Sequence, residues 1–305
     1  MTEATRGVIA MIVACTIWGL SGIYYKLLAH IPPLEVLAHR TIWSCVFFTL
    51  VLLWQGRLRV LLAVFRSPRA MMLAGLAAIM ISTNWLVFIT SIQIDMAIEA
   101  SLGYFIFPLV SVALGAAVYR ERMSAAQAVA VALALAAVVT LTVGLGVAPW
   151  ISLIIAGSFG FYGLIKKGIA QGPVVSVAAE VMILAPIALV VLWYTHPGGT
   201  GVFGSGWRDV VLLMFSGVLT GGPLIMFSMA AKRVSMATVG LIQYINPSLQ
   251  FLVATLLFLE PFTLWHMITF PMIWVALAIY TAATWRQDRA VRRAAKSALT
   301  SGTAL

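Results

Sequence analysis

Three ionisable residues lie deep inside long apolar segments: Arg40, Glu99 and Glu180. A charged side chain near the centre of a bilayer costs on the order of 3 kcal/mol unless it faces protein or water. At about 1.5 Å per helical residue, Arg40 lies roughly 9 Å below the outer end of its segment, and Glu99 lies about one turn below the outer end of its own. Glu180 lies roughly two turns in from the other side. Such residues fit either a structural ion pair or a polar solute site, and both roles stay open for Arg40 with Glu99.

His39 is the next candidate for chemistry. It shares a helix face with Glu35 and Trp43 at i, i+4 spacing. Because its ordinary pKa is about 6.5, a histidine here could relay protons. The alternative is a hydrogen-bonded structural histidine.

Aromatic residues form a third candidate group. Flat or cationic organic solutes bind well in aromatic-walled cavities. The same residues could instead belong to the packed core or to the interfacial belts. The five aromatics that lie in motifs near glycine or proline are Trp18, Trp85, Tyr104, Tyr162 and Tyr244.

A proline motif occurs twice in the chain. Tyr-Phe-Ile-Phe-Pro at 104–108 aligns with Gln-Tyr-Ile-Asn-Pro at 243–247 without a gap, and Glu121 and Glu260 follow at the same distance from the prolines. A proline inside a helix removes one backbone hydrogen bond and leaves a free carbonyl. Pro108 and Pro247 are therefore predicted to kink two helices beside a cavity, although membrane helices also tolerate kinks that packing repairs.

The composition is that of a membrane protein. Of the 305 residues, 62% are hydrophobic and 9% are charged, against roughly 45–50% and about 25% in soluble domains. The net charge of +10 lies in short clusters between apolar runs. This distribution is typical of cytoplasmic membrane loops and excludes a nucleic-acid-binding face.

Ten apolar segments approach the roughly 20 residues that a helix needs to cross a bilayer. Helices satisfy their own backbone hydrogen bonds, so we expect an all-α polytopic membrane protein with ten transmembrane helices. The expected spans are 7–28, 34–54, 70–91, 96–118, 124–146, 149–167, 173–194, 208–230, 236–258 and 264–285. Lysines and arginines cluster on one side, so both termini are predicted to be cytoplasmic and the connection at 196–206 to lie outside.

The proline motifs indicate two copies of one module, expected at 1–147 and 148–305. A second match supports this interpretation, because residues 18–22 with Lys26 align with 159–163 and Lys167. Five spans per copy is an odd number, so the second copy would enter the membrane upside down. Such inverted repeats are typical of transporters, in which the two halves exchange roles as the site opens to either side.

Several motifs along the chain are specific when taken together. They are His39-Arg40-Thr-Ile-Trp43-Ser44, Asn84-Trp85, 99–109, Glu121-Arg122, 158–163 with Lys167, Gln243-Tyr244-Ile-Asn246-Pro247 and 273–280. With these motifs the chain resembles, over nearly its whole length, the RarD branch of the EamA, or drug/metabolite transporter (DMT), superfamily. The resemblance implies ten helices in two inverted five-helix repeats, a bacterial inner-membrane location and export or exchange of small organic molecules. Phe107 departs from the family pattern, which usually has asparagine before the proline, whereas Asn246 keeps it.

We therefore expect a secondary transporter or facilitator that exports an amino acid, amine, drug or related metabolite by alternating access. The expected gating kinks are Pro108 and Pro247. Candidate cavity residues are Trp18, His39, Arg40, Asn84, Trp85, Glu99, Tyr104, Tyr162, Glu180, Gln243, Tyr244 and Asn246.

The alternative classes are a membrane receptor or scaffold without transport, and a membrane-embedded enzyme using Glu99 and His39 as acid and base. The chain carries no Walker A loop, HExxH motif or nucleophile elbow. We accordingly expect no catalytic residue, no cofactor and no metal. The expected partners are the solute and the lipid bilayer, with protons as a candidate coupling ion; the oligomeric state is left open.

Overall fold

The structure is a computed structural model that describes residues 2–120, 123–146, 148–195, 203–204, 206–234 and 236–302. The expected all-α architecture is confirmed, because the elements of the described residues are all helices. They are α1 (Glu3–Leu27), α2 (Pro33–Trp54), α3 (Leu58–Arg66), α4 (Pro68–Gln93), α5 (Ala97–Tyr119), α6 (Ala125–Leu145), α7 (Trp150–Lys167), α8 (Pro173–Thr195), α9 (Trp207–Ala231), α10 (Met236–Gln243), α11 (Ile245–Leu252), the π-helix η1 (Val253–Leu257) and α12 (Leu264–Gly302).

Within the described part of the chain, nine helical stretches are long and apolar enough to cross a membrane. The segment Thr238–Leu257, which combines most of α10 with α11 and η1, counts as one of them. The expected span at 149–167 corresponds to α7, which is only 18 residues long, ends in two lysines and is not among the nine. The count of ten spans therefore stays a prediction.

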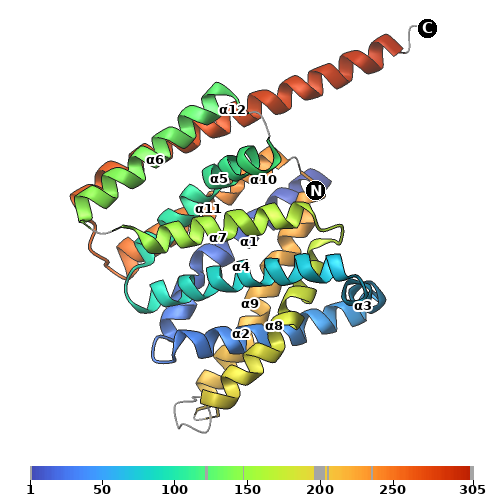
Figure 1. Ribbon diagram of the computed structural model, residues 1–305, viewed down its shortest axis with the longest axis vertical. Helices are drawn as coiled ribbons and strands as arrows, with labels where there is room; N and C mark the ends of the chain where they lie inside the picture. The colour runs from blue at the N-terminus through green and yellow to red at the C-terminus, as the bar shows by residue number, and fades with distance from the viewer. Residues whose placement is uncertain are drawn as a thin grey trace.

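Three segments differ from the expectation. The connection after the second span contains α3, a short amphipathic helix that buries Leu61 and Val64. The span expected at 236–258 is broken into α10, α11 and η1. The helix expected at 264–285 continues through the basic tail to Gly302, and α12 projects beyond the bundle (Figure 1). Glu121, Arg122 and most of the connection at 196–206 lie outside the described residues.

The helices pack as one bundle in which each half of the chain contacts the other. α2 packs against α8 and α9, α5 against α7 and α11, and α6 against α12. In Figure 1, the paired α6 and α12 form one edge of the molecule, and the N-terminus, α3 and the projecting part of α12 lie at the same end. We call this end of the bundle the terminal end and the other the far end.

Two glycines permit close approach between helices. A Cβ atom added at Gly19 of α1 would lie 2.7 Å from Cβ of Leu249 in α11. A Cβ atom added at Gly160 of α7 would lie 3.1 Å from Cγ1 of Val110 in α5. Small residues at such positions let membrane helices pack backbone to backbone. These contacts bring α1 and α7 tightly against the two helices that carry the proline motifs.

Candidate functional site

A cavity of about 320 Å³ lies between α5, the α10–α11 break and α12. The two proline motifs form opposite parts of its wall, and α12 supplies a third side with Tyr280 and Thr281. Ser111, Thr284 and Trp285 place the cavity toward the terminal end of the bundle. The lining residues are Tyr104, Phe107, Pro108, Ser111, Phe159, Gly240, Leu241, Gln243, Tyr244, Asn246, Pro247, Tyr280, Thr281, Thr284 and Trp285.

Each of the two prolines leaves one backbone carbonyl without its usual helical donor. Proline has no N–H and cannot bond to the carbonyl four residues earlier. That carbonyl belongs to Tyr104 in α5 and to Gln243 in α10, and both residues line the cavity. The helix also breaks at Tyr244, three residues before Pro247, with α10 ending at Gln243 and α11 beginning at Ile245. Broken helices with free backbone groups are typical of the binding sites of transporters.

Tyr104 connects the cavity to a buried polar cluster. Its hydroxyl donates a hydrogen bond of 2.8 Å to Oδ1 of Asn84, and the amide nitrogen of Asn84 donates to the carbonyl of Ile155 at 3.1 Å and to Oγ of Ser158 at 3.3 Å. The ring of Tyr104 also makes edge contacts with Phe88. Asn84 therefore orients the Tyr104 side chain at the cavity wall.

Arg40 lies behind this wall and is 7% exposed. Its Nε donates to Oγ1 of Thr220 at 3.0 Å, and Nη1 donates to the hydroxyl of Tyr25 at 2.6 Å. The guanidinium carbon is 4.0 Å from the centre of the Trp85 ring, which is cation–π distance. Four elements, α1, α2, α4 and α9, thus converge on one positive charge.

Glu180 is fully buried in α8 and forms a different cluster. Its Oε1 is 2.6 Å from Nζ of Lys166, and its Oε2 accepts a hydrogen bond of 3.1 Å from the hydroxyl of Tyr162. Ser176 bonds to the same carboxylate at 3.0 Å. The Glu180 charge is therefore neutralised within the protein.

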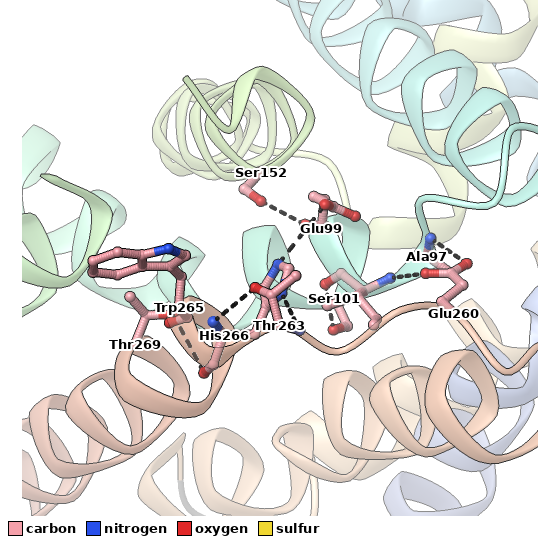
Figure 2. A network of polar contacts seen from close by, with 10 residues as sticks. Ala97, Glu99, Ser101, Ser152, Glu260, Thr263, Trp265, His266 and Thr269 are labelled. Atoms are coloured by element: carbon pink, nitrogen blue, oxygen red, sulfur yellow. Dashed lines mark hydrogen bonds and ion pairs between the residues drawn. The ribbon is translucent and has the colours of Figure 1, made fainter. Parts of the chain in front are cut away.

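The far end of the bundle is closed by a network of polar contacts (Figure 2). The Glu260 carboxylate accepts hydrogen bonds from the backbone N–H groups of Ala97 at 2.7 Å and Ile98 at 2.8 Å. It thereby caps α5, whose own N-cap residue, Met96, makes no side-chain cap. The Glu99 carboxylate lies 3.9 Å from Nε2 of His266 in α12, and the backbone carbonyl of Glu99 accepts from Ser152 of α7.

Lys26 extends this network to α1. Its ammonium bonds to Asp95 in the α4–α5 turn and to the carbonyl of Ile92, and lies 5.4 Å from the ring centre of Phe258. We call Lys26, Asp95, Glu99, Glu260 and His266 the far-end seal. These residues come from both halves of the chain.

Glu260 lies between the membrane-spanning segments and is 7% exposed. Burial raises the pKa of its carboxyl above the ordinary value, the two backbone N–H donors act in the opposite direction, and the carboxylates of Glu99 and Asp95 raise the pKa further. The carboxyl is therefore easier to protonate in the sealed structure than in water.

Comparison with known proteins decides the family. Residues 5–143 match the EamA-like transporter family. A protein called "Uncharacterized transporter" from Vibrio cholerae is 38% identical over 293 residues, covering 96% of this chain and 97% of that protein. "Protein RarD" from Streptomyces exfoliatus is 41% identical over 292 residues, covering 95% and 92%. The chain is a RarD-like member of the EamA family.

The fold of this RarD-like protein also occurs in a solved crystal structure. That structure superposes with a TM-score of 0.60 at 17% identity, covering 93% of this chain and 99% of the other. The agreement concerns the fold alone. Together with the apolar helices and the named relatives, it describes a multi-pass bacterial membrane transporter.

The structure brings together at the cavity six of the fourteen residues expected there, counting the two prolines, and places the rest elsewhere. Those that line it are Tyr104, Pro108, Gln243, Tyr244, Asn246 and Pro247. Asn84 contacts the wall through Tyr104, and Trp85 covers Arg40. Trp18 instead packs on Phe227, and His39 stacks on Phe203 with ring centres 4.7 Å apart.

None of the three deep charges is among the residues that line the described cavity. Arg40, Glu180 and Glu99 each belong to a separate polar cluster, and the ion pair between Arg40 and Glu99 is not formed in this structure. Glu260 and Glu35 lie near the ends of the expected spans, yet they are buried, at 7% and 0% exposure. Hydropathy locates such residues at helix ends and says nothing about which chain segment covers them.

Some residues of the site lie outside the motifs identified in the sequence. Phe159 and Tyr280 line the cavity and belong to the motifs at 158–163 and 273–280, whereas Thr281 and Trp285 also line it and belong to none. The lysine that pairs with Glu180 is Lys166, whereas the repeat alignment points to Lys167. The available signal was that Lys166 and Glu180 lie at the same end of neighbouring helices.

Proposed function

We propose that this RarD-like transporter exports a small organic solute, such as an amino acid, an amine, a drug or a related metabolite, across the bacterial inner membrane. It acts as a secondary transporter or facilitator by alternating access around the cavity at the paired prolines, and it is not an enzyme. The observation that carries the proposal is this cavity, which is lined by three tyrosines and by the proline motifs of both halves of the chain.

The packing pattern supports two inverted halves at 1–147 and 148–305. If α7, α8, α9, α10–α11 and α12 repeat α1, α2, α4, α5 and α6, then exchanging the halves turns each major contact into another observed one. The contact of α4 with α7 becomes that of α9 with α1, and α2 with α9 becomes α8 with α4. Three pairs map onto themselves: α2 with α8, α5 with α11 and α6 with α12.

The two close glycine contacts follow the same exchange. Gly19 and Gly160 are equivalent in the sequence repeat, and so are Leu249 and Val110. The structure pairs Gly19 with Leu249 and Gly160 with Val110. A contact made twice by equivalent residues is expected of a repeated module and has no evident use in a static receptor or scaffold.

The described conformation fits one state of an alternating-access cycle. The cavity lies toward the terminal end, and the far-end seal closes the opposite end. With cytoplasmic termini, as the distribution of lysine and arginine favours, this state faces the cytoplasm. An exporter in this state is ready to load its solute from inside.

The test is solute counterflow with purified protein in liposomes. Vesicles are preloaded with one unlabelled amino acid, amine or amphipathic drug, and uptake of the labelled compound is followed. We expect transient accumulation for at least one compound class and none in vesicles without protein. Absence of counterflow for all classes, with folded protein present in the vesicles, would contradict the proposal.

A further inference from the structure

The surroundings of Arg40 are the starting point. The residue is 7% exposed, and its guanidinium contacts the hydroxyls of Thr220 and Tyr25 and the ring of Trp85. All three partners are neutral. Arginine keeps its charge in essentially any protein environment, so the positive charge here is real.

No carboxylate among the described residues forms an ion pair with Arg40. The two deep carboxylates are used elsewhere, Glu99 beside His266 and Glu180 beside Lys166. The printed contacts use Nε and Nη1 of Arg40, and Nη2 has no hydrogen-bond partner within the described part. A buried charge without a counter-ion is costly, and arginine is the side chain whose planar donor fork best matches a carboxylate.

The equivalent position in the second half is different. α2 and α8 both begin at a proline, Pro33 and Pro173, and Arg40 and Glu180 are each the seventh residue after it. α2 and α8 also pack against each other. Yet the second half supplies Lys166 as the ion-pair partner of Glu180, whereas Arg40 forms no ion pair with a described residue. The two equivalent positions therefore differ in that only the one in the second half holds an ion pair.

Arg40 is connected to the cavity through a chain of three aromatic side chains. Tyr104 lines the cavity and contacts Phe88 with ring centres 5.8 Å apart, and Phe88 contacts Tyr25 at 5.8 Å. Tyr25 accepts the hydrogen bond from Arg40, and Trp85, the neighbour of Asn84, covers the guanidinium. These rings have to move before a solute in the cavity can reach Arg40.

We propose that Arg40 is the anion-recognition group of the transporter and binds the carboxylate of an organic solute whose apolar body occupies the aromatic cavity. This inference rests on the proposed transport function and deepens it by naming the substrate class. The carboxylate takes the donors that the protein leaves free and supplies the missing counter-charge. Arg40 does not contribute to the binding affinity of organic amines that lack a carboxylate.

The experiment compares three probes with one phenyl body: 3-phenylpropionate, L-phenylalanine and 2-phenylethylamine. Their binding to the purified full-length protein in detergent is measured by titration calorimetry, and counterflow is measured separately in liposomes. In the wild-type protein, we expect the two carboxylates to bind at least about tenfold more tightly than the amine, since a hydrogen bond to a charged group contributes about 1.5–3 kcal/mol.

The variants Arg40→Gln and Arg40→Lys test the residue itself. Arg40→Gln should weaken 3-phenylpropionate binding by about tenfold or more and leave 2-phenylethylamine binding unchanged, whereas Arg40→Lys should retain part of the affinity. Arg233→Gln is the matched control, because Arg233 pairs with Glu3 at the surface. If Arg40→Gln does not fold, the ranking of the three probes on the wild-type protein still tests whether the site prefers carboxylates to amines.

Two results would overturn the inference: 2-phenylethylamine binding as tightly as the carboxylates, or neither carboxylate binding at millimolar concentration. Equal weakening of all three probes by Arg40→Gln would also do so, because it indicates a structural role. Binding selectivity without any flux would instead contradict the transport function while leaving the carboxylate site intact.

Discussion

At the scale of single residues, the charges inside this protein have different roles according to their partners. Glu180 is neutralised by Lys166, Glu260 caps a helix, and Arg40 has neutral neighbours only among the described residues. The sequence identifies such residues as unusual because they interrupt apolar spans. It could not distinguish the three roles, since each depends on a side chain from a distant part of the chain.

The Lys166–Glu180 pair gives a stability prediction. Lys166→Met should destabilise the protein by on the order of 3 kcal/mol, because it leaves the fully buried Glu180 charge without its partner. The double variant Lys166→Met/Glu180→Gln should recover most of this loss, since no charge remains. Thermal unfolding in detergent measures both. A double variant no more stable than Lys166→Met would show that the pair is not the source of the effect.

Glu260 gives a pH prediction. The pKa of the Glu260 carboxyl is raised in the sealed structure. The contribution of Glu260 to the stability of the sealed conformation is therefore fully present below the ordinary carboxyl pKa, and it is lost as pH rises through the raised pKa. A cysteine at Ser101, buried one turn inside α5, should therefore become more accessible to a membrane-impermeant maleimide as pH rises.

The matched variants separate this effect from the reagent's own pH dependence. Glu260→Gln should remove the extra pH dependence, and Glu260→Ala should raise labelling severalfold at all pH values because the cap of α5 is lost. Glu3→Gln, at the terminal end, is the control. Identical labelling profiles for Glu260→Gln and the wild type would show that protonation of Glu260 does not control access to Ser101.

At the scale of elements, the paired proline motifs were the most informative part of the sequence. They predicted two kinked helices beside a cavity, because a repeated proline has a local backbone effect that needs no knowledge of the fold. In the structure, Pro108 and Pro247 both line the described cavity. The break between α10 and α11 was not predicted, and neither was α3. In α5 the same motif stays within one continuous helix, so proline alone does not determine whether a helix breaks.

Replacing these prolines should slow transport. Pro247→Ala restores a donor for the Gln243 carbonyl and favours joining α10 to α11, and Pro108→Ala does the same for the Tyr104 carbonyl. We expect kcat to fall severalfold with little change in KM, because the kinks shape the motion more than the ligand contacts. Pro186→Ala is a suitable control, since Pro186 lies inside α8 away from the cavity-lining residues. Unchanged turnover in both test variants would assign the prolines to packing alone.

At the scale of the whole molecule, hydropathy predicted the helical membrane fold well, because about 20 apolar residues have few alternatives in a bilayer. The packing of the halves could be anticipated only from the repeat. The contribution of α12 to the cavity wall could not be anticipated from the repeat, since Tyr280 and Thr281 reach the site through tertiary packing.

The orientation in the membrane follows from the charge distribution and can be tested directly. A cysteine at Gly206, before α9, should react with an impermeant maleimide added to intact cells, whereas a cysteine at Gln55, after α2, should react only after permeabilisation. Cys15 and Cys45 are replaced first. The reverse pattern would invert the topology and the assignment of the described state as facing the cytoplasm.

The central claim is that the cavity at the paired prolines is the transport pathway, and filling it is the most direct test. Gly240 lines the cavity, and a Cβ atom added there would meet no atom within 4 Å. Gly75 of α4 has equally open space but is not among the cavity-lining residues, so it provides the control. The measurement is solute counterflow in liposomes with equal amounts of folded protein. We predict that Gly240→Trp abolishes counterflow while Gly75→Trp retains it, and wild-type counterflow in Gly240→Trp would contradict the account.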